Sequence, residues 1–218
     1  MSDLRAAPDA VGALVRRIRD LLGSTDRVLI GVVGSPGAGK STLTDALGAA
    51  LEAGGVRCAV VGMDGFHLAQ AELDRLGRAE RKGAIDTFDG DGYLALLRRL
   101  RAQRPGDDVI YAPRYVRGAL EQPIGSHVPV AAGVRVVLTE GNYLLAETPP
   151  WDRVREVVDE TWFLRTDPVA RRERLLARHL ANGKSMEPAL AFTDGSDARN
   201  AELVEATAEA AELVVDWD

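Results

Sequence analysis

The chain has 218 residues, of which 46% are hydrophobic and 28% are charged, and its formal net charge is -6. This balance is typical of a globular protein and fits one α/β domain better than two. The acidic net charge argues against nucleic acid as a partner. The single cysteine, Cys58, excludes an internal disulfide bond and favours a cytoplasmic location. No segment approaches the ~20 apolar residues that span a bilayer, so we expect no membrane partner.

The apolar pattern alternates between helical spacing and short continuous runs. In chain order, we expect a helix at 8–22, strands at 28–33 and 58–61 on either side of a helix at 40–53, a helix at 90–103, strands at 109–111, 134–138 and 161–164, helices at 168–181 and 197–210, and a strand at 213–215. Such alternation predicts a mostly parallel sheet with helices on both faces, a three-layer α/β/α fold. The carboxyl ends of its strands would then share one edge, where ligands bind.

The strongest motif is GSPGAGKS at residues 34–41, which matches G-x-x-x-x-G-K-[ST] between an expected strand and helix. In this context, backbone N–H groups and the start of the helix converge on phosphate oxygens. Lys40 supplies a mobile positive charge and Ser41 a hydroxyl ligand for Mg²⁺. A ligand-free glycine turn would not explain why a lysine and a hydroxyl follow the last glycine. The predicted nucleotide-binding residues are Gly34, Ser35, Pro36, Gly37, Ala38, Gly39, Lys40, Ser41 and Thr42.

Two carboxylates follow expected strands. Asp64 would lie beside the phosphate loop, where it could serve as the base for an alcohol acceptor; the alternative is a turn aspartate before Gly65. Glu140 could hold the water shell of Mg²⁺ opposite Ser41, and the alternative is a turn or capping residue. The expected metal-binding residues are therefore Ser41, Glu140 and Asp64.

The sequence also lacks two motifs that mark other classes of P-loop protein. It has neither the Asn-Lys-x-Asp motif of GTPases nor the Leu-Ser-Gly-Gly-Gln motif of transporter ATPases.

Two further segments carry polar residues that suit substrate contacts. A loop before the helix at 90–103 holds Lys82, Asp86, Phe88 and Asp89, and loops over an active site often select the substrate. Arg171, Arg174 and Arg178 share one face of the helix at 168–181. This helix would be a lid whose Arg174 and Arg178, together with Lys40, stabilise a phosphoryl group in transfer. The alternative in both cases is a solvated surface.

Together, GSPGAGKST, MDGFH, RKGAIDTFD, LTEGNYLL and RLLARH resemble the superfamily of uridine kinases, phosphoribulokinases and bacterial pantothenate kinases. The likeness is closer to bacterial proteins described as nucleoside/nucleotide kinase family or fructose-transport-system kinases, and it runs from about residue 25 to the end. It implies a five-stranded parallel core, a helical lid at about 168–185, and ATP and Mg²⁺ as cosubstrates. Asp64 corresponds to the family's base, and Glu140 ends its fourth core strand.

The resemblance also implies acceptor contacts. The segment APRYVRG at 112–118 lies where uridine kinases have a substrate hairpin, so His67, Tyr115 and Arg117 are expected to contact the acceptor. Asp86, Asp64 and Glu140 complete the expected substrate-binding set. Arg114 and Arg117 would also suit an acidic or phosphorylated acceptor. Uridine kinases have Pro-Asp-Ala-Phe-Asp where this chain has Ile85 to Asp89, a partial match. Asp197 and Asn200 fall near the family's adenine site.

These observations predict one kinase domain over residues 1–218. It would transfer the γ-phosphate of ATP to a hydroxyl group of a nucleoside, a sugar or a pantothenate-like compound. The alternative is a nucleotide-binding ATPase or regulatory switch without an acceptor. The sequence leaves open which acceptor is used, whether ATP or GTP is preferred, which lid arginine is catalytic and whether the chain forms a homodimer.

Overall fold

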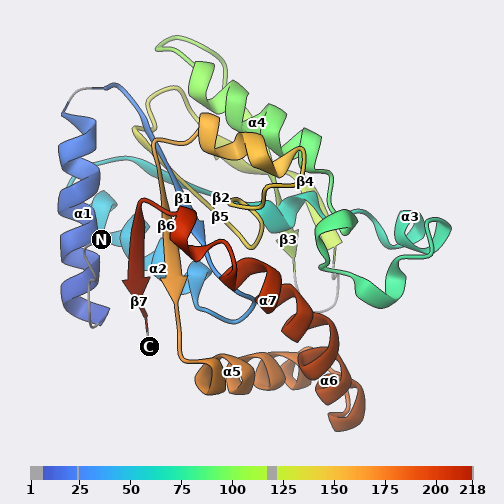
Figure 1. The fold of residues 1–218 in the computed structure, drawn as a ribbon. Helices are drawn as coiled ribbons and strands as arrows, with labels where there is room; N and C mark the ends of the chain where they lie inside the picture. Colours follow the sequence, from blue (N-terminus) through green and yellow to red (C-terminus); the bar gives the residue numbers. More distant parts are fainter. Residues whose placement is uncertain (1–6, 24, 117–121, 218) are drawn as a thin grey trace.

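The computed structural model describes residues 7–23, 25–116 and 122–217 of the chain. Its centre is a five-stranded sheet in the order β2-β5-β1-β6-β7 (Figure 1). The strands are β1 (Val28–Val33), β2 (Cys58–Gly62), β5 (Val136–Gly141), β6 (Glu160–Arg165) and β7 (Leu213–Asp216). Every neighbouring pair is parallel. The expected five-stranded parallel core is thus confirmed.

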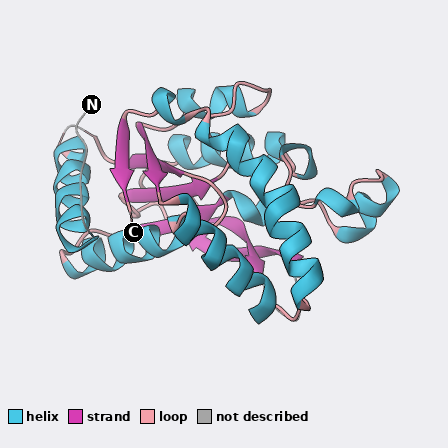
Figure 2. Cartoon of the chain, turned by 60° about the horizontal axis from the view of Figure 1, so that its bottom comes forward, coloured by secondary structure: helices cyan, strands magenta, loops and turns pink. Residues whose placement is uncertain are grey.

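Helices cover both faces of this sheet, as Figure 2 shows. One face carries α1 (Ala7–Leu22) and α2 (Lys40–Ala53), and the other carries α4 (Gly90–Ala102) and the short helix η4 (Trp151–Glu156). Successive residues of a strand point to opposite faces, so in β1 Leu29 packs toward α4 while Ile30 packs toward α1 and α2. Burial on both sides explains why the central strands are continuous apolar runs.

A second, two-stranded sheet lies outside the parallel one. It is an antiparallel hairpin of β3 (Ile110–Val116) and β4 (Gln122–Val130). The strand predicted at 109–111 therefore belongs to this hairpin rather than to the main sheet. The β4 strand was not predicted, because Pro123 and Pro129 lack an N–H donor and the segment has no continuous apolar run. The expected hairpin around residues 112–118 is present over its described residues.

The hairpin lies directly against the turn that follows β2. This turn is η1 (Met63–Phe66), a single 3₁₀ turn. A Cβ atom on Gly65 would come within 2.5 Å of the carbonyl oxygen of Pro113. The Asp-Gly pair in the sequence thus reflects close backbone packing between η1 and β3, with Asp64 at the contact.

The carboxyl-terminal third of the chain is helical before β7. Helix α5 (Pro168–Ala181) has the predicted bounds, because the side chain of Asp167 caps its first turn and Pro168 begins it. It is followed by α6 (Met186–Phe192), the π-helical turn η5 (Thr193–Asp197) and α7 (Ala198–Glu205). The predicted helix at 197–210 is wrong in extent. The helix stops at Glu205, where the Thr207 hydroxyl donates a hydrogen bond to the carbonyl oxygen of Val204. A short 3₁₀ turn, η6 (Ala208–Ala210), follows.

The remaining short helices are α3 (Gln70–Arg75), η2 (Ala79–Arg81) and η3 (Ile85–Thr87). They connect β2 to α4 and occupy the loop that the sequence analysis expected there. Across the described ranges, no helix combines the length and apolar character needed to cross a bilayer.

Candidate active site

A cleft of about 700 Å³ lies at the carboxyl ends of the parallel strands, between the phosphate loop, η1, the hairpin and helices α5 to α7. This is the edge of the sheet at which the sequence analysis predicted that ligands bind. Of the predicted site residues, the cleft is lined by Pro36, Gly37, Gly39, Lys40, Ser41, Thr42, Asp64, His67, Tyr115, Glu140, Arg174 and Arg178. Residues from distant parts of the chain therefore meet in one cavity.

The phosphate loop joins β1 to α2, whose first residue is Lys40. Gly37 and Gly39 have φ angles of 83° and 92°, a region that favours glycine. A Cβ atom on Gly39 would also lie 2.9 Å from the Trp217 ring. The loop thus ends at a helix N-terminus, with the backbone geometry that an anion cradle requires. The glycines are explained by this geometry as well as by close packing.

Lys40 is only 8% exposed and spans the loop from within. Its Nζ donates to the carbonyl oxygens of Gly34 at 2.7 Å and Ser35 at 3.2 Å, and to Oδ1 of Asn142 at 2.7 Å. Asn142 also lines the cleft, and the sequence analysis missed it. Its place two residues after Glu140, just beyond the same strand end, is the signal that could have found it.

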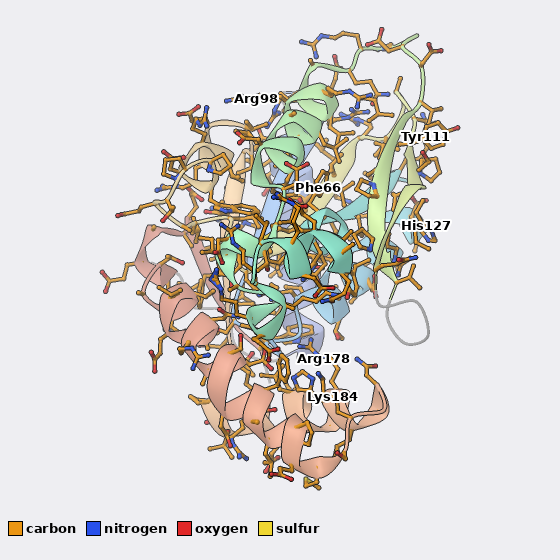
Figure 3. All side chains as sticks on the ribbon, turned by 90° about the vertical axis from the view of Figure 1, so that its right-hand side faces the viewer. Phe66, Arg98, Tyr111, His127, Arg178 and Lys184 are labelled. Atoms are coloured by element: carbon orange, nitrogen blue, oxygen red, sulfur yellow. The ribbon has the colours of Figure 1, made fainter. Side chains whose placement is uncertain are left out.

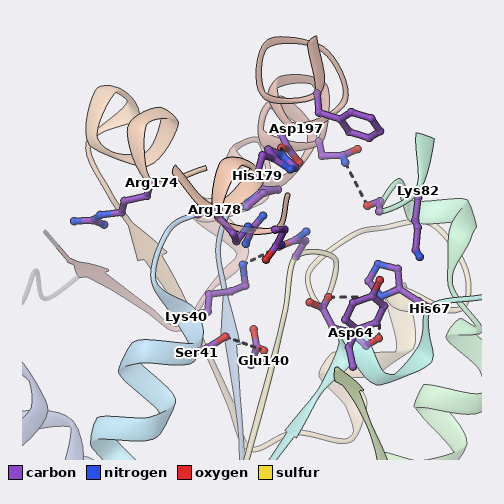
Figure 4. Close-up of a pocket in the computed structure, with 18 of the residues that line it drawn as sticks. Lys40, Ser41, Asp64, His67, Lys82, Glu140, Arg174, Arg178, His179 and Asp197 are labelled. Atoms are coloured by element: carbon purple, nitrogen blue, oxygen red, sulfur yellow. Dashed lines mark hydrogen bonds and ion pairs between the residues drawn. The ribbon is translucent and has the colours of Figure 1, made fainter. Parts of the chain in front are cut away.

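The two predicted carboxylates come from neighbouring strands. Gly62, at the end of β2, is paired with Glu140 in β5, and Asp64 follows two residues later. The Ser41 hydroxyl lies 3.3 Å from Oε1 of Glu140, while Asp64 lies on the opposite side next to His67 (Figure 4). A hydroxyl and two carboxylates are the oxygen donors that Mg²⁺ prefers beside phosphates. Residues Ser41, Glu140 and Asp64 therefore fit a magnesium nucleotide.

A dedicated protein cage for a metal is not part of this arrangement. Within residues 7–23, 25–116 and 122–217, no group of three or more His, Cys, Asp or Glu side chains could hold a metal ion. In nucleotide sites, Mg²⁺ takes one or two carboxylates and completes its shell with phosphate oxygens and water.

Aromatic rings wall the end of the cleft next to Asp64. The ring of His67 lies 4.1 Å from that of Phe88 and 4.7 Å from that of Tyr115, centroid to centroid. The Nδ1 atom of His67 lies 2.8 Å from the backbone oxygen of Asp64 and 4.0 Å from its carboxylate. Lys82 extends over the Tyr115 ring, with its Nζ 5.5 Å from the centroid. We call this part, formed by His67, Lys82, Phe88 and Tyr115, the aromatic end.

The helices α5 to α7 cover the other side of the cleft. Arg178 lies above Lys40, whereas the guanidinium group of Arg174 points away from Asp64 (Figure 4). In Figure 3, Arg178 and Lys184 both lie where these helices face the rest of the protein. Arg171 instead donates to the Pro36 carbonyl at 3.3 Å and is not part of the cleft lining.

Helix α5 is tied to the segment that follows it. The Nε2 atom of His179 lies 2.7 Å from Oδ2 of Asp197, and the Nζ atom of Lys184 lies 3.8 Å from the centre of the Phe192 ring. Asp197 and Asn200, expected near adenine, both line the cleft. The sequence analysis assigned no role to His179, Lys184 or Phe192. His179 ends the RLLARH motif, whereas Lys184 and Phe192 belong to no motif and join it only through the fold.

Some predicted residues lie elsewhere. The Asp86 carboxylate pairs with Arg81 at 2.8 Å and is not among the residues that line the cleft. The Ser35 hydroxyl is buried and donates to Glu205 at 2.5 Å, so Ser35 contributes its backbone to the loop. Gly34 and Ala38 are buried within the loop as well. Arg117 lies outside the described residues.

A parallel sheet with a glycine-rich loop between β1 and the helix that starts at Lys40 defines the class of P-loop nucleotide-binding proteins. Comparisons with known proteins agree. The chain is 35% identical over 209 residues to "Putative uridine kinase C227.14" of Schizosaccharomyces pombe, covering 91% of this chain and 88% of that protein. The protein belongs to the P-loop kinase family that includes this uridine kinase relative.

Solved structures give the same result. A crystal structure described as a "putative fructose transport system kinase" from Silicibacter sp. TM1040 is 34% identical, with a TM-score of 0.84, and covers 95% of this chain and 98% of that one. The kinase-like protein YFH7 from Saccharomyces cerevisiae has a TM-score of 0.79 at 17% identity, covering 96% of this chain and 98% of that one. At this identity, the latter shows the shared fold alone. The predicted resemblance to P-loop kinases is confirmed.

One match points to a different activity. A family model described as "Methylmalonyl Co-A mutase-associated GTPase MeaB" matches residues 4–68. This stretch contains the phosphate loop and Asp64, but it is less than half of the chain. It ends before Lys82, the hairpin, Glu140 and helix α5. The match therefore reports the phosphate-binding part that P-loop proteins share.

Proposed function

We propose that this protein transfers the γ-phosphate of ATP to a hydroxyl group of a small molecule, with Asp64 as the general base. The proposal treats residues 1–218 as one kinase domain. The observation that carries it is the meeting of Lys40, Ser41, Asp64, Glu140 and Arg178 in a single cleft. A nucleotide site alone would need no carboxylate beside an aromatic-walled cavity next to the phosphate loop.

In the proposed reaction, the oxygen of the acceptor hydroxyl forms a bond to the γ-phosphorus. The bond from that phosphorus to the β,γ-bridging oxygen breaks, and ADP leaves with the bonding electrons. Asp64 holds the acceptor hydroxyl by a hydrogen bond and receives its proton. Asp64 is suited to this role because it stands between the phosphate loop and the aromatic end of the cleft.

The other residues supply positioning and charge. Lys40 exchanges its bonds to the Gly34 and Ser35 carbonyls for phosphate oxygens, and the loop amides hold the remaining oxygens. Ser41, Glu140 and Asp64 would hold Mg²⁺, which would offset charge on the β- and γ-phosphates. Arg178 lies on the side of the cleft above Lys40, where a guanidinium group stabilises the phosphoryl group in transfer (Figure 4).

We further propose that residues of about 168–185 act as a lid. Helix α5 already touches the phosphate loop, since Arg171 bonds the Pro36 carbonyl and a Cβ on Gly37 would lie 2.8 Å from Leu175. Closing this helix over bound nucleotide would exclude water from the transferring phosphoryl group, which limits hydrolysis.

The test is a screen of pooled sugars, polyols, hydroxy acids, nucleosides and vitamins with radiolabelled ATP and Mg²⁺. We expect label to move to an acceptor with the parent protein and not with Lys40→Ala. ADP release at one slow rate in every pool, without labelled product, would contradict a kinase function.

A nucleotide-dependent switch is the second candidate, favoured by the GTPase description of the family model that matches residues 4–68. Under this alternative, the protein would bind and slowly hydrolyse nucleotide without a second substrate. Titration with ATP and GTP, followed by acceptor pools, separates the two. A preference for GTP together with acceptor-independent turnover would favour the switch.

A further inference from the structure

Lysine has an unusual distribution in this chain. The sequence has three lysines, Lys40, Lys82 and Lys184, against a combined total of 27 lysines and arginines. All three line the active-site cleft, whereas the remaining members of that total are arginines. Lysine differs from arginine in presenting a compact point charge on a flexible stem. Its confinement to the cleft links each lysine to ligand binding rather than to general surface solubility.

The three lysines occupy different parts of the cleft. Lys40 belongs to the phosphate loop, and Lys184 lies at the lid against the Phe192 ring. Lys82 lies at the aromatic end, over Tyr115, which also lines the cleft together with Asp64 and His67. With the phosphate chain of the nucleotide on the loop side, Lys82 faces the space left for the acceptor.

The turn that carries Lys82 is held by buried groups. The carbonyl of the next residue, Gly83, accepts hydrogen bonds from the Tyr143 hydroxyl at 2.7 Å and from Nδ2 of Asn200 at 3.3 Å. The Gly83 amide donates to the hydroxyl of Thr87 at 3.0 Å. Thr87 is fully buried, and Asn200 is 5% exposed. Burial also raises the pKa of Tyr143, which keeps its hydroxyl a donor.

These hydrogen bonds fix the backbone of the turn that carries Lys82. Gly83 has a φ of 98°, so the turn needs glycine next to the lysine. The anchors come from three separate parts of the chain: the end of η3, the segment after β5, and α7. A fixed turn beside a flexible cationic side chain is how a site directs one charge at a ligand.

From this geometry we infer that the acceptor carries an anionic group, a carboxylate or a phosphate, in addition to its reactive hydroxyl, and that Lys82 binds that group. The inference rests on the proposed kinase function and narrows its substrate class. The acceptor hydroxyl would lie at Asp64, with the rest of the molecule against His67 and Tyr115.

Steady-state kinetics test the inference with three sets of alcohols: hydroxycarboxylic acids, sugar phosphates, and neutral sugars or nucleosides. We expect phosphorylation of a compound from one of the two anionic sets, and which set reacts separates carboxylate from phosphate. Lys82→Met should lower kcat/KM for that acceptor by about 10- to 100-fold, the effect of one charge-assisted hydrogen bond. The KM for ATP should stay unchanged, and Lys82→Arg should recover most of the activity.

Arg81→Met is the matched control. Arg81 is the neighbouring cation of the same turn and pairs with Asp86 outside the cleft lining. Its removal changes the net charge equally, so it should leave kcat/KM for the acceptor unchanged. An equal loss in Arg81→Met and Lys82→Met would overturn the inference, because general charge or turn stability would then explain both. An unchanged kcat/KM in Lys82→Met would overturn it as well.

The inference and the kinase function can fail separately. If only neutral alcohols accept phosphate, the kinase function stands and the anionic acceptor is refuted. If no alcohol accepts phosphate, the kinase function fails, and binding decides the inference. In that case, thermal shifts with a non-hydrolysable ATP analogue and the same compounds should show stabilisation by an anionic set that is lost in Lys82→Met. Shifts that do not depend on Lys82 would refute it.

Discussion

The Nζ atom of Lys40 lies 2.7 Å from the side-chain oxygen of Asn142, which joins the phosphate loop to the end of β5. This bond holds the lysine extended toward the cleft before nucleotide arrives. Asn142→Ala should weaken ATP binding by about 3- to 10-fold, since Lys40 keeps its two carbonyl partners in the loop. Lys40→Ala should weaken it much further. Titration with a fluorescent ATP analogue measures both, and equal affinity of Asn142→Ala and the parent would show the bond to be dispensable.

Asp64→Asn separates nucleotide binding from phosphoryl transfer. The amide keeps the size of the side chain beside His67 but cannot take the acceptor proton. We expect kcat to fall by about 10²- to 10⁴-fold, the usual contribution of a general base. Thermal stabilisation by ATP without Mg²⁺ should stay close to that of the parent, because the phosphate loop is untouched. Unaltered kcat in this variant would remove Asp64 from the proposed mechanism.

The parts of the site that the sequence could predict depend on local spacing. The phosphate loop is a contiguous motif, and Asp64 and Glu140 follow apolar runs, so parallel topology alone places them on one edge. Residue pairs far apart in the chain could not be predicted this way. Nothing local links Gly83 to Asn200 or His179 to Asp197, and these contacts depend on how α5 to α7 return over the sheet.

Two fold errors have a similar origin. The β4 strand has prolines and polar side chains because it lies in a separate hairpin, so it lacks the apolar run of a central strand. The helix expected at 197–210 reads as continuous in composition, but a hydroxyl at Thr207 ends its regular hydrogen bonding. Asp86 shows the converse: its position in a motif predicts a substrate contact, while its carboxylate pairs with Arg81. A substrate role for Asp86 stays a prediction.

Cys58 should be an unreactive thiol in the folded protein. It packs against the apolar cluster under α1 and α2, and burial, with a smaller contribution from the charge of Glu52, raises the pKa of the Cys58 thiol to about 12. A raised pKa means that the thiolate is scarce at neutral pH and appears only as the pH approaches 12. Reaction with a disulfide reagent at pH 8 should be slow, and fast in urea. A native rate that levels off near pH 8.5, as for an ordinary cysteine, would contradict this.

Arg27 should be a major contributor to stability despite its distance from the cleft. It is buried, and its guanidinium group donates to the carbonyls of Leu100, Ala131, Ala132 and Val134 and to the side chain of Gln103. Burial lowers the pKa of Arg27, with the positive charges of Arg101 and Arg104 adding to the effect; the group still stays charged.

Arg27→Met would leave buried carbonyls without donors, so we expect the free energy of unfolding to fall by about 3 kcal/mol or more. Arg27→Lys should not restore it, because one ammonium group cannot reach the same set of acceptors. Urea denaturation measures the change. Arg135→Met is the control: Arg135 is exposed, its bonds to backbone carbonyls are 3.1 to 3.4 Å long, and its loss should cost less than about 1 kcal/mol. Equal losses in the two methionine variants would contradict the assigned role of Arg27.

Arg174 and Arg178 lie one helical turn apart on α5, and their side chains point in different directions. Arg178 lies above Lys40, whereas Arg174 points away from Asp64 (Figure 4). In the proposed mechanism Arg178 contacts the phosphoryl group in transfer, so Arg178→Met should lower kcat by about 10²- to 10³-fold, as the loss of one transition-state donor does in other enzymes.

Arg174→Met is the matched variant, with the same charge change on the same helix. It should act mainly on the KM for ATP, because Arg174 lines the cleft while its guanidinium group points away from Asp64. Initial rates at saturating ATP and acceptor give kcat for both variants, and circular dichroism checks that α5 remains folded. A larger loss of kcat in Arg174→Met than in Arg178→Met would reverse the assignment, and would mean that the lid turns about its axis when it closes.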